Sequence, residues 1–232
     1  PARRGDAVGH LHAEPAPALV VSAGQATRLL VVRHGETDWN AAGRIQGHTD
    51  IPLNPRGLWQ AERLAEALAG EAFDAVYASD MARALQTLQP LATRLDLEPQ
   101  TDPGLRERGF GRFEGLSFDQ IERAWPNDAA RWRAREPHFA PGGGESLTVF
   151  YARCVGAVER LGERHRGGSI VIVTHGGVLD CLYRAATRLA LHAPRSWALG
   201  NAAVNRLLHT GQGLTLVGWN DDAHLNQVGV GG

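Results

Sequence analysis

The chain has 232 residues, of which 43% are hydrophobic and 21% are charged, and its formal net charge is −1. These proportions are typical of a soluble globular protein, and the length suits one sizeable α/β domain rather than two. The nearly balanced charge argues against a broad basic surface for nucleic acid or a membrane. All 24 basic residues are arginine, which excludes Schiff-base chemistry and a phosphate-binding loop built on lysine.

The cysteines and the apolar runs indicate the compartment. Cys154 and Cys181 lie in helical patterns, so we expect buried free thiols in a reducing compartment, with a disulfide as the alternative. Residues 1–27, rich in Ala, Pro and Gly, are predicted to be a flexible N-terminal arm, and residues 28–232 the folded domain. No apolar run is long enough for a signal-peptide core or a membrane span. We therefore expect a cytoplasmic protein.

The first half of the chain alternates predicted strands and helices. Four aliphatic residues in a row predict a strand over 29–33, buried on both faces of a parallel sheet. A polar loop follows, and a helix begins at Pro55, because proline suits a first helical turn. A second strand is predicted over 73–79 and a second helix over 80–95. This alternation is the pattern of a doubly wound α/β sheet.

Ser79 or Asp80 is the expected N-cap of the helix over 80–95. Residues 103–144 are irregular, with short helical pieces near 117–125 and 127–135, and are predicted to form a lid over a functional site. The remaining elements are a helix over 145–165, a strand over 170–173, a helix over 178–189, and a hairpin of strands 203–209 and 214–219. The prediction is a single-domain α/β three-layer sandwich, with a mostly parallel central sheet and helices on both faces.

Two of the buried strands end in the same dipeptide. The strand over 29–33 runs into Arg33-His34-Gly35, and the strand over 170–173 runs into Thr174-His175-Gly176. In a parallel sheet the ligand site lies beyond the carboxyl ends of the strands, so both His-Gly pairs can reach one small ligand. Two histidines that merely cap strands are the alternative. With Arg33 beside one pair and a second glycine after the other, the pattern favours a catalytic phosphate site.

Further motifs follow the first His-Gly pair in a characteristic order. They are Arg33-His34-Gly35-Glu36-Thr37, Trp39-Asn40, Arg44-Ile45-Gln46-Gly47, Ser79-Asp80 with Arg83 and Thr87, Leu105-Arg106-Glu107, Phe110-Gly111-x-Phe113-Glu114-Gly115, Pro141-Gly142-Gly143-Gly144-Glu145-Ser146 and Thr174-His175-Gly176. Together they resemble the histidine phosphatase superfamily, also called the phosphoglycerate mutase-like family. The resemblance covers residues 28 to 226, and it implies this family's fold and phosphoryl-transfer chemistry.

The resemblance also implies roles for individual residues. His34 would attack phosphorus and form a phosphohistidine, with Glu36 and Thr37 as the nearest groups to orient its ring. His175 would donate to the phosphoryl oxygens. The remaining residues implied are the phosphate clamp Arg33 and Arg83, the general acid Glu107, and the substrate-binding residues Asn40, Gln46, Gly47 and Gly176. The alternatives are an exposed helix arginine for Arg83, a turn asparagine for Asn40 and a solvated loop acid for Glu107.

We predict no metal and no cofactor. The ten histidines show no metal-ligand spacing such as H-x-x-x-H, and Arg33 beside His34 would oppose a cation. The expected partner is a small phosphate monoester, without nucleic acid or membrane. The oligomeric state is left open, and a homodimer is allowed.

Hydrolysis is favoured over isomerisation, because mutases of this family carry Arg-His after the general acid and a long insertion. Here Arg108-Gly109 follows Glu107, and the insertion is short. A cofactor-dependent phosphoglycerate mutase and a non-catalytic module that binds phosphorylated ligands stay as alternatives. The prediction is thus a metal-independent phosphomonoester hydrolase.

Overall fold

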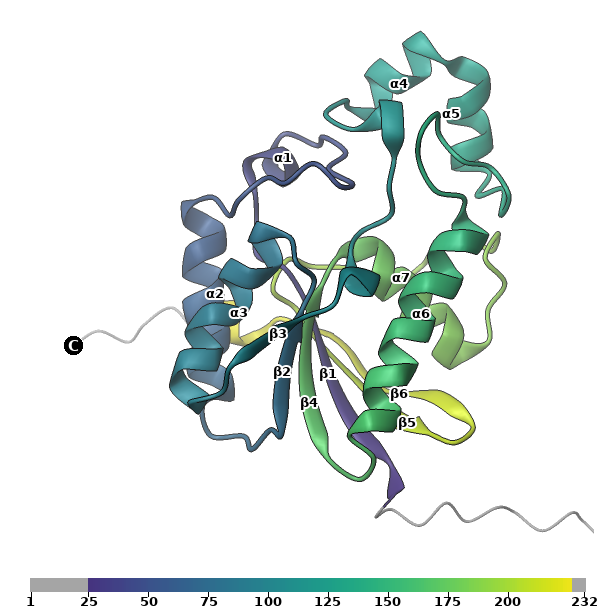
Figure 1. Cartoon of the computed structure of the whole chain (residues 1–232). Helices are drawn as coiled ribbons and strands as arrows, with labels where there is room; N and C mark the ends of the chain where they lie inside the picture. Colours follow the sequence, from purple (N-terminus) through teal and green to yellow (C-terminus); the bar gives the residue numbers. More distant parts are fainter. Residues whose placement is uncertain (1–24, 227–232) are drawn as a thin grey trace, which may run out of the picture.

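The computed structural model describes residues 25–226, which form a six-stranded sheet in the order β3-β2-β4-β1-β5-β6 (Figure 1). β1, β2, β3 and β4 are mutually parallel. At one edge of the sheet, β5 pairs antiparallel with β1, and β6 pairs antiparallel with β5. The strands are β1 (Thr27–Arg33), β2 (Ala75–Ala78), β3 (Pro99–Thr101), β4 (Ser169–Thr174), β5 (Val204–Thr210) and β6 (Gly213–Asp221).

Helices cover both faces of this sheet. They are α1 (Asp38–Ala41), α2 (Pro55–Leu68), α3 (Ala82–Leu95), α4 (Phe118–Ala124), α5 (Pro126–Arg133), α6 (Leu147–Arg164) and α7 (Gly176–Thr187), with single 3₁₀ turns at Pro103–Leu105, Gly111–Phe113 and Ala223–Leu225. Side chains alternate along β1 and β4, so Leu29 and Ile170 pack with α6 and α7, whereas Leu30 and Val171 pack with α2 and α3. The predicted three-layer sandwich is confirmed.

Two predicted boundaries differ from the structure. Thr27, assigned to the arm, begins β1 and is buried there, and its hydroxyl donates to Gly162 O at 2.6 Å. Residues 1–24 of the predicted arm lie outside the described residues. The cap of α3 is Met81, not Ser79 or Asp80. Those two side chains are engaged elsewhere, Ser79 with His175 and Asp80 with Arg106.

The segment 103–144 rises beyond the carboxyl ends of the parallel strands (Figure 1). Its two helices, α4 and α5, occupy the predicted short helical pieces and form a small core of their own. The members of that core are Phe113, Ile121, Ala129 and Phe139, flanked by partly buried aromatic residues including Phe118, Trp125 and Trp132. The aromatic side chains of this segment therefore pack on one another.

A contact between two glycines sets how closely α2 approaches the end of β1. A Cβ built on Gly35 would lie 2.7 Å from the carbonyl oxygen of Gly57 in α2. Only glycine fits this approach without a shift of the backbone. The structure thus gives Gly35 a packing role against α2.

Candidate active site

The ends of β1 and β4 place two imidazoles side by side. His34 N donates to Thr174 O at 2.8 Å, and the ring centroids of His34 and His175 are 5.2 Å apart. Both side chains are buried, at 3% and 0% exposure. The two His-Gly strand ends therefore converge, as the sequence predicts.

The ring of His34 is oriented by the backbone. Its Nδ1 lies 2.7 Å from Gly35 O, and a carbonyl oxygen only accepts, so Nδ1 carries the proton and Nε2 keeps its lone pair. Glu36 and Thr37, the expected orienting groups, bind elsewhere: Thr37 caps α1, and Glu36 accepts from Asn54. Burial, reinforced by the charges of Arg33 and Arg83, holds the pKa of His34 well below its ordinary value of 6.5.

Two arginines border this ring, and some of their hydrogen-bond donors have no partner among the described residues. Arg33 donates through Nη1 to Leu199 O, and Arg83 donates to Thr49 O at 3.0 Å and Gly47 O at 2.9 Å. Their Nε groups are buried and have no partner among the described residues. Burial lowers the pKa of both guanidinium groups. A buried donor without a partner costs about 1–3 kcal/mol, so this arrangement is adapted to an anion.

His175 presents a third unused donor position. Its Nε2 lies 2.6 Å from the hydroxyl of Ser79, at the end of β2, while its Nδ1 is buried without a partner within residues 25–226. Burial, with the nearby Arg83, lowers the pKa of His175 well below its ordinary value. When Ser79 donates to Nε2, the proton of the neutral ring is on Nδ1.

Glu107 reaches the site beside the glycine pair that begins α7. Its Oε2 accepts from Gly177 N at 2.9 Å, and its Oε1 accepts from Arg108 N at 2.8 Å. A Cβ on Gly177 would collide with this carboxylate, and a Cβ on Gly176 would lie 3.3 Å from Arg33 Nε. The glycine pair therefore lets a carboxylate and a guanidinium approach the start of the helix together.

The segment around Glu107 is held by ion pairs on both sides. Arg106 binds Asp80 with two hydrogen bonds of 2.6 Å each, which lowers the pKa of Asp80. Arg153, from α6, donates to Glu107 O at 3.1 Å and pairs with Glu145 at 2.7 Å. These contacts tie Glu107 to α6 and to the end of β2.

The loop after α1 forms another wall of the site. Gln46 and Gly47 are buried, and Asn40 is half-buried with its amide oxygen accepting from Thr37. The cavity measures about 200 Å³ and is lined by Arg33, His34, Asn40, Arg44, Ile45, Gln46, Gly47, Arg83, Glu107, Phe110, Gly176, Gly177 and Leu199. The structure thus gathers the sequence-predicted site residues around one small cavity, with His175 against His34.

Three residues that support this site have no function predicted from the sequence. Ser79 binds His175, Arg153 holds the Glu107 segment, and Glu114 accepts from the amides of His48 and Thr49, each at 3.0 Å. Ser79 and Glu114 lie in the motifs noted above, and this position in the sequence indicates that they belong to the site. Arg153 lies in an ordinary amphipathic helix, so nothing in the sequence distinguishes it.

Three other observations bear on the kind of site. No group of three His, Cys, Asp or Glu side chains in the described part of the chain is placed to hold a metal ion. No helix there is long and apolar enough to cross a membrane. Cys154 and Cys181 are buried free cysteines, as expected.

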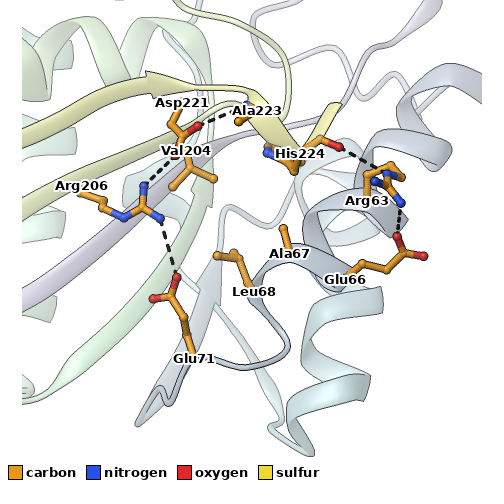
Figure 2. Close-up of a pocket in the computed structure, with 10 residues that line it drawn as sticks. All are labelled: Arg63, Glu66, Ala67, Leu68, Glu71, Val204, Arg206, Asp221, Ala223 and His224. Carbon is orange, nitrogen blue, oxygen red and sulfur yellow. Dashed lines mark hydrogen bonds and ion pairs between the residues drawn. The ribbon is translucent and has the colours of Figure 1, made fainter. Parts of the chain in front are cut away.

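A second cavity, of about 360 Å³, lies between α2 and the β5–β6 edge (Figure 2). Its charged groups neutralise one another: Arg206 pairs with Asp221 at 3.1 Å and Glu71 at 3.7 Å, and Arg63 pairs with Glu66. Its carboxylates outnumber its guanidinium groups. This cavity is therefore poorly suited to a phosphate, in contrast to the one around His34.

Comparison with known proteins defines the class. The model of the histidine phosphatase superfamily (branch 1) matches residues 29–222, and the chain belongs to this superfamily. The predicted resemblance is confirmed.

Individual relatives carry phosphatase and mutase-like names. Phosphoglycerate mutase-like protein 4 of Arabidopsis thaliana is 41% identical over 205 residues, 87% of this chain and 88% of the relative. A metal-independent phosphoserine phosphatase of the same plant is 38% identical over 208 residues, 88% and 86% of the two chains. The crystal structure of a phosphoserine phosphatase from Entamoeba histolytica in complex with 3-phosphoglyceric acid has a TM-score of 0.77 and 29% identity, covering 86% of this chain and 99% of that one.

The two buried histidines make the stability of the chain depend on pH. Burial keeps both rings neutral in the fold well below pH 6.5, whereas the same rings in the unfolded chain take up protons near that value. The unfolded state then binds more protons, so stability is full above about pH 6.5 and falls as the pH drops. We expect the pair to lower the free energy of unfolding by the order of 2 kcal/mol from about pH 7 to about pH 5.5.

Urea unfolding at the two pH values measures this effect. The double variant His34→Asn/His175→Asn should lose that part of the pH dependence, while His138→Asn, which replaces an exposed histidine, should keep it. An equal pH dependence in the parent chain and the double variant would contradict neutral burial.

Proposed function

We propose that this chain hydrolyses small phosphate monoesters through a phosphohistidine intermediate on His34. The observation that carries the proposal is a neutral imidazole with a free Nε2, next to three buried nitrogens without partners on Arg33, Arg83 and His175. Phosphoryl transfer needs an in-line nucleophile and positive groups around the equatorial oxygens. The phosphatase names among the relatives support the same reaction class.

In the first step, Nε2 of His34 attacks phosphorus and the bond to the ester oxygen breaks. Arg33, Arg83 and His175 donate to the phosphoryl oxygens, and the loss of one such donor typically costs about 10²–10³ in rate. Glu107 gives its proton to the departing oxygen. In the second step, Glu107 takes a proton from water, which attacks phosphorus and releases inorganic phosphate and neutral His34.

The segment 103–144 serves in this proposal as the lid of the site, because it supplies Glu107 and Phe110 to the cavity wall. Asn40, Gln46, Gly47 and Gly176 line the same cavity, which supports the substrate-binding role proposed for them. Unpaired Cys154 and Cys181 fit a reducing, cytoplasmic location.

Phosphoglycerate mutation is the second candidate, and the name of one relative favours it. A mutase has to bind a small sugar acid, and for this it needs further positively charged residues that follow the general acid in the sequence. Here Arg108 follows Glu107, but it is buried and its guanidinium donates to Glu145 O and Phe139 O, each at 2.9 Å. That guanidinium is therefore committed to the lid, which supports hydrolysis over mutation.

Activity assays without metal distinguish the two reactions. We expect p-nitrophenyl phosphate to release phosphate, and 3-phosphoglycerate with a trace of 2,3-bisphosphoglycerate to show negligible isomerisation. His34→Ala should abolish the release of phosphate from p-nitrophenyl phosphate. Rapid isomerisation would contradict hydrolysis as the main reaction, and activity that survives His34→Ala would contradict the mechanism.

The acid role of Glu107 predicts a dependence on the leaving group. Glu107→Gln should lower kcat/KM for an alkyl phosphate by about 10²–10⁴, the usual contribution of general acid–base catalysis, and far less for p-nitrophenyl phosphate. An aryl oxygen departs without a proton, and kcat/KM reports only the steps up to its departure. Equal losses on the two substrates would remove the acid role.

A further inference from the structure

We propose that Asp180 is a positioning residue, which aligns Arg33 for phosphate binding through the segment between α7 and β5. Asp180 lies in the second turn of α7 and is 5% exposed, yet it does not line the cavity around His34. The buried carboxylate therefore has no direct part in the reaction. The inference rests on the proposed function, because it concerns how one arm of the phosphate clamp is held.

Asp180 forms a buried cluster with two arginines. Its Oδ2 accepts from Arg184 Nε at 3.0 Å, one turn further along α7, and from Arg135 Nη2 at 2.6 Å, just after α5 in the lid. Arg184 is 1% exposed. Oδ1 of Asp180 and Nη2 of Arg184 are buried without partners among the described residues. A buried ion pair with unsatisfied atoms is weak evidence of a gain in stability, so the cluster indicates another role.

The other donors of the two guanidinium groups hold the segment that follows α7. Arg184 Nη1 donates to Ala190 O at 2.6 Å, and Arg135 Nε donates to Leu191 O at 2.9 Å. Residues 188–203, which we call the α7–β5 segment, contain no helix or strand. Without a regular backbone ladder, the placement of this segment depends on such contacts with side chains.

The cluster also reaches the far end of the α7–β5 segment. The guanidinium of Arg184 lies over the ring of Trp197, 4.8 Å from its centroid, and Trp197 stacks on Tyr183 with ring centroids 4.0 Å apart. Leu199, two residues later, lines the cavity, and its carbonyl oxygen accepts from Arg33 Nη1. A continuous chain of contacts therefore runs from the buried cluster to Arg33.

Arg33 depends on the α7–β5 segment, whereas Arg83 does not. Among the described residues, the Leu199 carbonyl is the one hydrogen-bond partner of the Arg33 side chain, whose Nε has none. Arg83 is held instead by the carbonyls of Gly47 and Thr49, in the loop after α1. A planar guanidinium has to be aligned to give phosphate two hydrogen bonds. A shift of the segment should therefore misalign Arg33 and leave Arg83 in place.

Asp180→Asn tests the cluster, because it removes the negative charge and keeps the shape of the side chain. The guanidinium groups of Arg135 and Arg184 then lose their shared counter-charge and repel each other, which releases the α7–β5 segment. We expect kcat/KM for p-nitrophenyl phosphate and the affinity for inorganic phosphate each to fall by about 10-fold, the lower end of the effect of a hydrogen bond to a charged group.

A double-mutant cycle on kcat/KM distinguishes alignment of Arg33 from a general loss of structure. Asp180→Asn should cost about 10-fold in the parent chain and in Arg83→Gln, but less than about 2-fold in Arg33→Gln, where no guanidinium is left to align. Asp128→Asn is the matched control, because it removes the carboxylate that pairs with Arg112 elsewhere in the lid. It should leave kcat/KM within about 2-fold of the parent value.

A second variant covers a failure of Asp180→Asn to fold, which urea unfolding would reveal. Trp197→Leu interrupts the chain of contacts without removing a charge, and it should show the same pattern in the cycle. For whichever variant folds, an equal loss in Arg33→Gln and Arg83→Gln would overturn the inference. A parent-like kcat/KM in Asp180→Asn would overturn it as well.

The proposed function fails on a different result. If the parent chain releases no phosphate from p-nitrophenyl phosphate, hydrolysis is contradicted, and the same cycle is read from the Kd of inorganic phosphate by calorimetry. In that readout, a loss of affinity confined to the chains that keep Arg33 supports the positioning role. An equal loss in the parent, Arg33→Gln and Arg83→Gln chains refutes it.

Discussion

An uncharged imidazole buried beside two guanidinium groups is the constraint on which the rest of the structure depends. The fold must bury Arg83 and the Nε of Arg33 without giving either guanidinium a carboxylate partner among the described residues, and must keep His34 neutral beside them. Buried charges are costly unless they are compensated. Backbone carbonyls supply the partial compensation here, from Leu199 for Arg33 and from Gly47 and Thr49 for Arg83. The remaining compensation is left to the substrate.

The arrangement of the sheet follows from this constraint. β1 and β4 are parallel neighbours, so their carboxyl ends bring His34 and His175 together, and β2 ends beside them with Ser79. Glycines at the start of α7 and at the contact with α2 remove the side chains that would keep these groups apart. The scaffold is therefore tightly packed where the reacting groups meet, as a preorganised electrostatic site requires.

Much of this organisation is readable from the sequence, because local signals and the global fold agree. Buried strands give uninterrupted aliphatic runs, and two of them end in histidine, so the sheet edge and the site follow together. The cap of α3 was predicted wrongly because Ser79 and Asp80 have suitable side chains whose tertiary partners, His175 and Arg106, the sequence does not reveal. The orientation of His34 by Gly35 O escaped prediction for a related reason: every residue has a carbonyl, so a backbone acceptor leaves no pattern.

His34 and His175 have different roles in the proposed reaction, and that asymmetry can be measured directly. The parent chain would be mixed with p-nitrophenyl phosphate, quenched in base within milliseconds to preserve acid-labile phosphohistidine, and digested for peptide mass spectrometry. We expect the phosphoryl group on the peptide that contains His34, and an unmodified His175. A phosphoryl group on His175, or substrate turnover without any phosphohistidine, would contradict the account.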